Sequence, residues 1–197
     1  MPRVILASTS PARRRLLETV GIPAEAVPAR IDEEAVRAAL LPEGASARDI
    51  ADTLGEMKAQ KVHDKHPDAV VIGSDQVLAL KGEVFAKPAS RAEAAEQLMR
   101  LQGAQHILLS SAVICFEGQP IWRTVGQARL RMHSLEHSDI DAYLATAWPG
   151  VEGSVGAYHA EGYGARLFSR IEGDWFSVLG LPLLDLCSYF RLRGWLT

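Results

Sequence analysis

The stretch VILASTSPARRR, which occupies residues 4–15, decides how this chain folds. Its apolar opening is typical of a short buried strand. Ser10 is a natural N-cap and Pro11 suits the first position of a helix, so a helix is expected directly after the hydroxyl-rich turn. Gly21 follows the apolar residues of that helix and predicts its end. The stretch therefore predicts a strand, a tight turn and a helix in immediate succession.

Three arginines, Arg13, Arg14 and Arg15, fall in the first turn of this helix. The helix dipole is positive there, so each cation costs about 0.3–1 kcal/mol. One interpretation is three solvated arginines on an amphipathic helix. The interpretation we favour is an anion site, because free N–H groups, hydroxyls and guanidinium groups together suit a phosphate or a carboxylate. On this view, removing Arg13 should weaken phosphate binding and leave the fold intact.

Length and composition indicate one domain over residues 1–197, with 48% hydrophobic residues to fill a core. The formal net charge of −3 argues against nucleic acid as a partner. Cys115 and Cys187 follow no metal-binding spacing, which favours reduced thiols. No apolar run approaches the ~20 residues of a membrane span, and the N-terminus lacks the apolar segment of a secretion signal. We therefore expect a cytoplasmic protein without a membrane partner.

Strand-like and helix-like segments alternate along the chain. An apolar run at 69–72 predicts a buried strand that continues to residue 78, and the segments 105–116 and 120–132 predict a long hairpin. Helices are expected from the cap at residue 46 to about residue 65, from residue 90 to about residue 102, and over 181–193. This order favours a mixed α/β fold, with a twisted mixed sheet flanked by helices and two lobes around a cleft.

Charged residues occur where the predicted elements end. Asp75 interrupts an apolar strand, where a buried carboxylate is costly unless it is paired or binds a cation; the alternative is a strand end that faces water. Glu33 belongs to an acidic triplet that could simply complement a helix dipole. Lys58 lies on the apolar stripe of its helix, and Lys87 precedes a proline. Together, these cations and carboxylates suit a metal-bound triphosphate, in which Mg²⁺ bridges carboxylate and phosphate oxygens.

Two common nucleotide-binding motifs, GxxxxGK[ST] and GxGxxG after a strand, are absent. The chain instead resembles the Maf-like nucleoside triphosphate pyrophosphatases, from Ile5 to about Arg193. The opening LASTSP, with the arginines that follow, is similar to the family's phosphate-binding SxSPxR element. Further motifs recur in the family's order: DE at 32–33, KA at 58–59, GSD at 73–75, KP at 87–88, GYG at 162–164, IEGD at 171–174 and VLGLPL at 178–183.

The resemblance implies a Maf/ITPase-like fold and hydrolysis between the α- and β-phosphates, with release of a nucleoside monophosphate and pyrophosphate. It implies that Asp75 is catalytic and that Glu33 and Asp75 hold a divalent cation, Mg²⁺ or Mn²⁺. The residues that it assigns to the triphosphate are Ser8, Arg13, Arg14, Lys58 and Lys87. The implied cellular role is removal of modified nucleotides before they enter nucleic acid.

Three positions bear on which base is bound. Gln76 and Glu161 resemble the 7-methyl-GTP subgroup, whereas Thr and Gln at these positions mark the dTTP/UTP enzymes. A carboxylate accepts hydrogen bonds from guanine N1–H and N2–H₂ and favours the positive charge of a base methylated at N7. Ala12 stands where the family usually has Arg or an aromatic residue. Two other departures are Ser110-Ser111 in place of Thr-Gly, and GSVG at 153–156 in place of a Lys-Ala-Gly element.

Two other interpretations stay open. The enzyme could act on dTTP/UTP or on a broad set of nucleotides; Gln76 and Glu161 speak against the former, and Ala12 leaves the latter open. The protein could also be a nucleotide-binding regulator of cell division with little turnover, against which Asp75 and Glu33 speak. The sequence leaves the oligomeric state open, a homodimer included.

Overall fold

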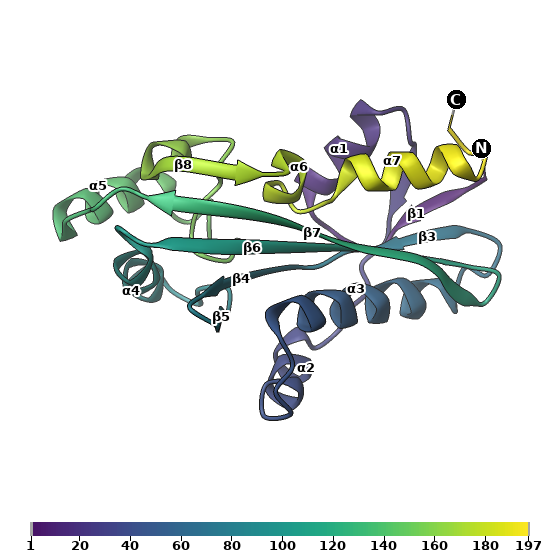
Figure 1. Ribbon diagram of the computed structural model, residues 1–197, viewed down its shortest axis with the longest axis horizontal. Helices are drawn as coiled ribbons and strands as arrows, with labels where there is room; N and C mark the ends of the chain where they lie inside the picture. The colour runs from purple at the N-terminus through teal and green to yellow at the C-terminus, as the bar shows by residue number, and fades with distance from the viewer. Residues whose placement is uncertain (1, 197) are drawn as a thin grey trace.

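The computed structural model describes residues 2–196 and shows a mixed α/β fold on one open sheet (Figure 1). The eight strands of the sheet are β1 (Val4–Leu6), β2 (Ala24–Ala26), β3 (Val70–Gly73), β4 (Gln76–Leu80), β5 (Glu83–Phe85), β6 (Gln105–Phe116), β7 (Gln119–Met132) and β8 (Phe168–Gly173). The helices are α1 (Pro11–Thr19), α2 (Glu33–Leu40), α3 (Ala47–His63), α4 (Arg91–Leu101), α5 (His137–Ala147), α6 (Trp175–Val178) and α7 (Leu183–Leu192), with a 3₁₀ helix over Tyr163–Leu167.

The long hairpin of β6 and β7 runs through the middle of the molecule (Figure 1). Its turn residues, Glu117 and Gly118, have φ of 52° and 83°, the left-handed conformation that two-residue hairpin turns favour. Strands follow in the order β2-β1-β3-β6-β4-β5, and β7 pairs with β6 and β8. The pairs β1–β2 and β1–β3 are parallel, and the others are antiparallel. The predicted hairpin is confirmed.

The prediction of one unbroken strand from residue 69 to residue 78 is wrong. The structure divides it into β3 and β4 at Ser74 and Asp75, although both segments pair with β6. The carbonyl of Ser74 accepts a hydrogen bond from Arg13 Nη1 at 3.0 Å. A side chain from α1 thus binds the backbone between the two segments, and Asp75 lies at the interruption.

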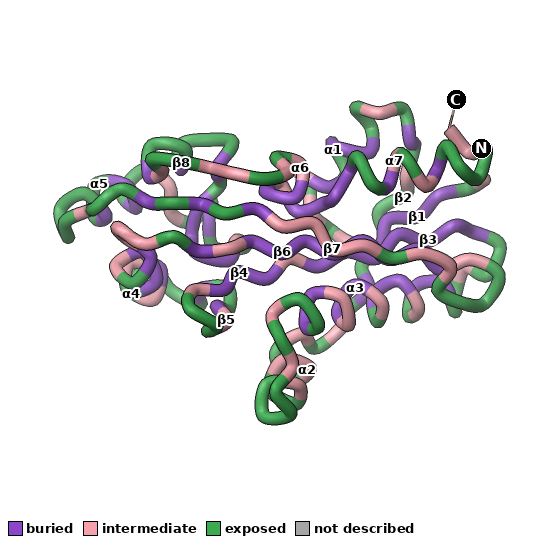
Figure 2. The backbone as a smooth tube through the Cα atoms, viewed as in Figure 1, coloured by how far each residue is buried: buried purple, intermediate pink, exposed green. Residues whose placement is uncertain are grey.

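Helices cover both faces of the sheet. Val70 and Ile72 pack with apolar residues of α1 and α7, while Val71, between them in the strand, packs on the opposite face with Val62 of α3. Figure 1 shows α1 and α7 on one side of the sheet and α3 on the other. A separate core at the other end of the hairpin joins α4, α5 and β8. Figure 2 shows buried backbone along the centre of the sheet, whereas α2 is exposed or half-buried along its length. The predicted sheet flanked by helices is confirmed.

Gly73 lets β3 approach α3 closely. A Cβ atom on Gly73 would lie 2.1 Å from the carbonyl oxygen of Gly55 and 2.5 Å from the backbone nitrogen of Ala59. Only glycine fits such a contact between backbones. The neighbour of Ala59 in α3, Lys58, is thereby held beside the end of β3.

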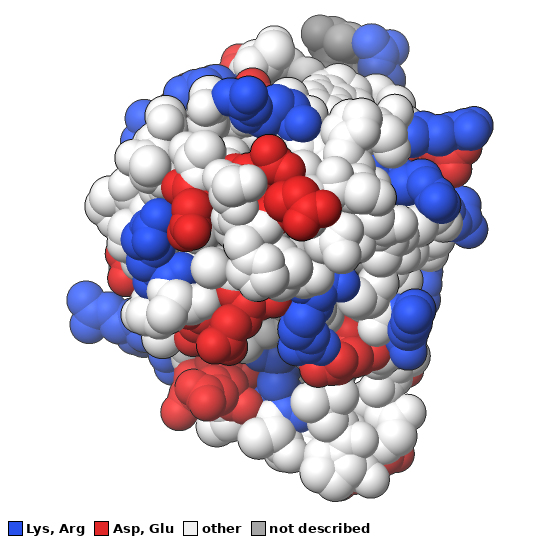
Figure 3. All heavy atoms as spheres, turned by 90° about the vertical axis from the view of Figure 1, so that its left-hand side faces the viewer, with Lys and Arg blue, Asp and Glu red and all other residues white. Residues whose placement is uncertain are grey.

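The surface carries both signs of charge. Figure 3, which faces the end of the molecule with α5, shows acidic and basic side chains interspersed. This mixture agrees with the small formal net charge of −3 over the sequence. Within residues 2–196, no helix has the length and apolar character needed to span a membrane.

Candidate active site

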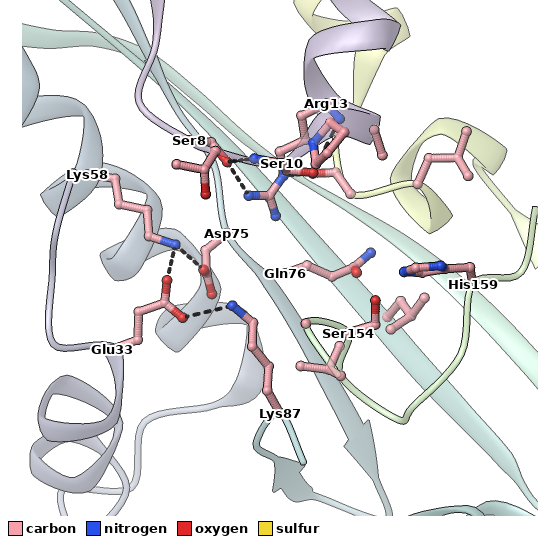
Figure 4. A pocket seen from close by; sticks show the side chains of 18 of the residues that line it. Ser8, Ser10, Arg13, Glu33, Lys58, Asp75, Gln76, Lys87, Ser154 and His159 are labelled. Carbon is pink, nitrogen blue, oxygen red and sulfur yellow. Dashed lines mark hydrogen bonds and ion pairs between the residues drawn. The ribbon is translucent and has the colours of Figure 1, made fainter. Parts of the chain in front are cut away.

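A cavity of about 780 Å³ brings together segments that are far apart in the sequence. The predicted site residues that line it are Ser8, Ala12, Arg13, Glu33, Lys58, Asp75, Gln76, Lys87 and Glu161. Arg14 is the exception, because it is exposed and pairs with Glu18 one helical turn later, Nε to Oε1 3.1 Å. The assignment of Arg14 to the triphosphate is therefore not supported by its position. Figure 4 shows most of these side chains around the cavity.

Ser8 lies in the turn between β1 and α1 with its hydroxyl ready to donate. Its Oγ accepts hydrogen bonds from the backbone N–H of Ser10 and from Arg13 Nη1, each at 3.2 Å. Because both lone pairs are used, the hydroxyl proton remains available for an incoming acceptor. The predicted N-cap is confirmed by Ser10 Oγ, which accepts from the N–H of Arg13 at 3.4 Å. This turn suits one oxygen of a phosphate group.

Arg13 is buried and bound to the backbone on two sides. Its Nε donates to the carbonyl of Gly180 at 2.8 Å, and its Nη1 donates to the carbonyl of Ser74 at 3.0 Å. Burial lowers the pKa of Arg13, and the charges of Asp75 and Glu33 oppose that shift. From these contacts we expect Arg13 to support the fold, whereas the helix dipole alone predicted that its removal would leave the fold intact.

A sequence signal distinguishes Arg13 from its two neighbours. Leu16 and Leu17 follow it at the i+3 and i+4 positions and are both buried. This spacing places Arg13 on the apolar stripe of α1, whereas Arg14 and Arg15 lie off it. Its position on this stripe buries the Arg13 side chain beside Ser74, which follows the end of β3.

Glu33 and Asp75 converge on a single cation, Lys58. Its Nζ lies 2.5 Å from Glu33 Oε1 and 2.5 Å from Asp75 Oδ1 (Figure 4). Lys87 Nζ approaches the other oxygen of Glu33 at 3.7 Å. Burial alone would raise the pKa of Glu33, but Lys58, Lys87 and Arg37 outweigh it and hold that pKa below its ordinary value. Glu33 is therefore ionised at neutral pH.

The second oxygen of Asp75 is suited to a divalent cation. Asp75 Oδ2 is buried and has no hydrogen-bond partner among residues 2–196. An unpartnered carboxylate oxygen beside a second carboxylate suits a hard cation that prefers oxygen ligands. Within the described part of the chain, no group of three or more His, Cys, Asp or Glu side chains is placed to hold a metal. Mg²⁺ commonly takes only one or two carboxylates and completes its shell with water and substrate phosphates, so the residues present fit it.

Gln76, Glu161 and His159 also line the cavity. Figure 4 shows Gln76 between Asp75 and His159. Glu161 and His159 are exposed, whereas Gln76 is half-buried. The lining therefore combines two carboxylates and several cations with further neutral and acidic side chains.

Two cations line the cavity that were not among the residues assigned to the triphosphate from the sequence. Arg15 and Arg30 both line the cavity and are exposed. Arg30 has φ of 51°, which is unusual for a residue with a side chain, and its carbonyl accepts a hydrogen bond from Lys61 Nζ at 2.6 Å. No local signal indicates Arg30, because its conformation depends on α3. Arg15 belongs to the basic cluster at residues 13–15, but nothing in the sequence distinguished its role from that of Arg14.

Comparison with known proteins places this geometry in a family. The model of the Maf-like protein family matches residues 3–192. A protein of Jannaschia sp. (strain CCS1) named nucleoside triphosphate pyrophosphatase 1 is 58% identical over 194 residues, 98% of each chain. A nucleoside triphosphate pyrophosphatase of Roseobacter denitrificans is 53% identical over 195 residues, again 98% of each chain. A 7-methyl-GTP pyrophosphatase of Mesorhizobium japonicum is 44% identical over 192 residues, 98% of this chain and 96% of that protein. This chain belongs to the Maf-like protein family.

Proposed function

We propose that this protein is a cytoplasmic nucleoside triphosphate pyrophosphatase that cleaves between the α- and β-phosphates. The observation that carries the proposal is the pairing of Glu33 and Asp75 through Lys58, beside the phosphate-binding turn at Ser8 in one cavity. A volume of about 780 Å³ is in the range of small-molecule sites. The names of the relatives support the same activity. The unpaired thiols of Cys115 and Cys187 support a reducing compartment.

In the proposed reaction, Asp75 is the general base. Its carboxylate takes a proton from a water molecule, and the water oxygen bonds to the α-phosphorus. The bond between that phosphorus and the bridging oxygen breaks, and the bridging oxygen leaves with pyrophosphate. Ser8, which Arg13 holds in place, donates a hydrogen bond from its hydroxyl to a phosphate oxygen. Lys58 and Lys87 balance the negative charge that develops.

A divalent cation, Mg²⁺ or Mn²⁺, is part of the proposal. Glu33 and Asp75 are the residues that would hold it, since their carboxylates both lie beside Lys58 and Asp75 Oδ2 has no hydrogen-bond partner among residues 2–196. When bound, the cation would neutralise phosphate charge as a Lewis acid. Lys58 then keeps the two carboxylates together and limits their mutual repulsion.

We propose 7-methyl-GTP as the preferred substrate. Gln76 and Glu161 both line the cavity. An ionised Glu161 accepts from guanine N1–H and N2–H₂ and attracts a positively charged base. The name of the Mesorhizobium japonicum relative supports this choice. The alternative is a dTTP/UTP or broad specificity, which the small side chain of Ala12 in the lining leaves room for.

Substrate preference is expected to follow Gln76 and Glu161. Gln76→Thr combined with Glu161→Gln should lower the ratio of kcat/KM for 7-methyl-GTP to that for UTP by at least ~10-fold. The double variant lacks the acceptors for the N–H groups of guanine, so its discrimination in favour of guanine is lost. Pyrophosphate release from both nucleotides measures the ratio. Glu152→Gln is the matched control, because Glu152 is exposed and lies outside the cavity lining. An unchanged ratio in the double variant would show that the base is read elsewhere.

A further inference from the structure

The orientation of the Gln76 amide follows from counting protons on its neighbours. Ser110 Oγ lies 2.7 Å from the carbonyl oxygen of Ser177. A carbonyl only accepts, so the single hydroxyl proton of Ser110 is used there. Ser110 Oγ can then only accept from Gln76, whose nearer amide atom is 3.0 Å away. That atom must therefore be the nitrogen.

Two further acceptors fix the same amide nitrogen. Gln76 Nε2 lies 3.0 Å from the carbonyl oxygen of Ser177 and 3.1 Å from that of Val178. The nitrogen and oxygen of an amide are usually assigned from their surroundings, and here three acceptors agree. The remaining polar atom, Gln76 Oε1, is the one left to bind a ligand in the cavity that Gln76 lines. Gln76 therefore presents an acceptor and no donor.

The carbonyl of Ser177 is itself held in place by Asp174. The Asp174 carboxylate caps α6 and accepts from the backbone N–H of Ser177 at 2.9 Å and from its hydroxyl at 2.6 Å. Ser110 and Ser177 are completely buried, and a Cβ atom on Gly126 would lie 2.0 Å from Ser177 Oγ. Packing and hydrogen bonds thus fix every member of this group.

We infer that Ser110, Ser177 and Asp174 are positioning residues that hold Gln76 as a hydrogen-bond acceptor and so select bases that offer N–H donors. This inference rests on the proposed function and adds to it the reason for base choice. With the Glu161 carboxylate, two of the side chains that line the cavity offer acceptors to a base. Guanine offers two adjacent donors, N1–H and N2–H₂. Uracil and thymine offer one N–H between two carbonyls, which are repelled by acceptors.

The next residue of β6, Ser111, acts on the other face of the sheet. Its Oγ donates to the carbonyl of Ala51 in α3 at 2.7 Å and accepts from the N–H of Asp75 at 3.1 Å. Successive side chains of a strand point to opposite faces, so one serine contacts the base-reading Gln76 and its neighbour contacts the catalytic Asp75. Ser111 is therefore a matched control for Ser110.

A double-mutant cycle tests whether Ser110 acts through Gln76. The measured quantity is the ratio of kcat/KM for GTP to that for UTP, whose base offers one N–H between two carbonyls. Ser110→Ala should lower the ratio about 5-fold, the scale of one hydrogen bond, and Gln76→Met at least ~10-fold. Adding Ser110→Ala to Gln76→Met should change the ratio no further. Ser110→Thr keeps the hydroxyl and should keep the ratio, while Ser111→Ala should lower kcat for both nucleotides equally.

Two outcomes overturn the inference. In the first, Ser110→Ala lowers kcat/KM equally for both nucleotides. In the second, Ser110→Ala changes the ratio as much in the Gln76→Met protein as in the wild type. If the wild-type protein releases no pyrophosphate from any nucleotide, the proposed function fails. The same cycle is then read from dissociation constants of GTP and UTP measured by calorimetry, so the two failures are distinguishable.

Discussion

Asp75→Asn is expected to lower turnover by at least ~100-fold, the usual scale of losing a general base. The substitution keeps the shape of the side chain, but an amide neither takes a proton from water nor balances the charge of Lys58, which lies 2.5 Å from Asp75 Oδ1. Nucleotide binding should survive in part, because the turn around Ser8 is unchanged. The measurement is kcat from pyrophosphate release, with nucleotide affinity by calorimetry and folding by circular dichroism.

Asp141→Asn is a suitable control for this change. Asp141 is an exposed carboxylate on α5 that pairs with Arg91 and lies outside the cavity lining. Its loss should leave kcat unchanged. Turnover like that of the wild type in a folded Asp75→Asn protein would refute the catalytic role of Asp75.

Arg13→Ala is expected to lower the free energy of unfolding by about 2–4 kcal/mol and to weaken triphosphate binding. The buried guanidinium donates to the carbonyls of Gly180 and Ser74, and its removal leaves a buried carbonyl oxygen without that partner, which costs about 1–3 kcal/mol besides the lost packing. Chemical denaturation measures the loss of stability. Affinity should fall because Ser8 loses one of the two groups that orient its hydroxyl.

The neighbouring Arg14→Ala is the matched control for Arg13→Ala. Arg14 is exposed and makes a surface ion pair with Glu18, so its removal should change stability by no more than ~0.5 kcal/mol and leave affinity unchanged. Equal effects of the two substitutions would contradict the different roles that the structure gives these arginines.

Much of the fold follows from local signals. The N-cap at Ser10, the capping box at Ser46 and Asp49, and the hairpin turn at Gly118 all form as their residue types predict. Each depends on residues within a few positions of one another, and short-range hydrogen bonds and backbone preferences decide it.

The division of the strand at Ser74 could not be predicted in this way. The partner of its carbonyl, Arg13, lies 61 positions earlier. An apolar run with one carboxylate is compatible with a continuous strand until α1 is docked on the sheet. The same contact buries a guanidinium that the helix dipole alone would leave in solvent.

The residue types at the site were predictable, but their arrangement was not. Glu33, Lys58 and Asp75 come from α2, α3 and the end of β3, and only the docking of these elements shows that Lys58 joins the two carboxylates. The orientation of Gln76 depends on carbonyls 101 and 102 positions away. A sequence identifies the amide, and only the fold decides which of its two atoms meets the ligand.

The products formed from 7-methyl-GTP test the central claim most directly. The wild-type protein, incubated with this nucleotide and Mg²⁺ or Mn²⁺, should release 7-methyl-GMP and pyrophosphate in equal amounts, identified by phosphorus NMR, and EDTA should abolish the release. Asp75 and Glu33 together account for this outcome, through the proton accepted by the Asp75 carboxylate and the two carboxylates that would hold the cation. Release of 7-methyl-GDP and phosphate would contradict the claim. So would tight binding of GTP, UTP, dTTP and 7-methyl-GTP without release of pyrophosphate from any of them.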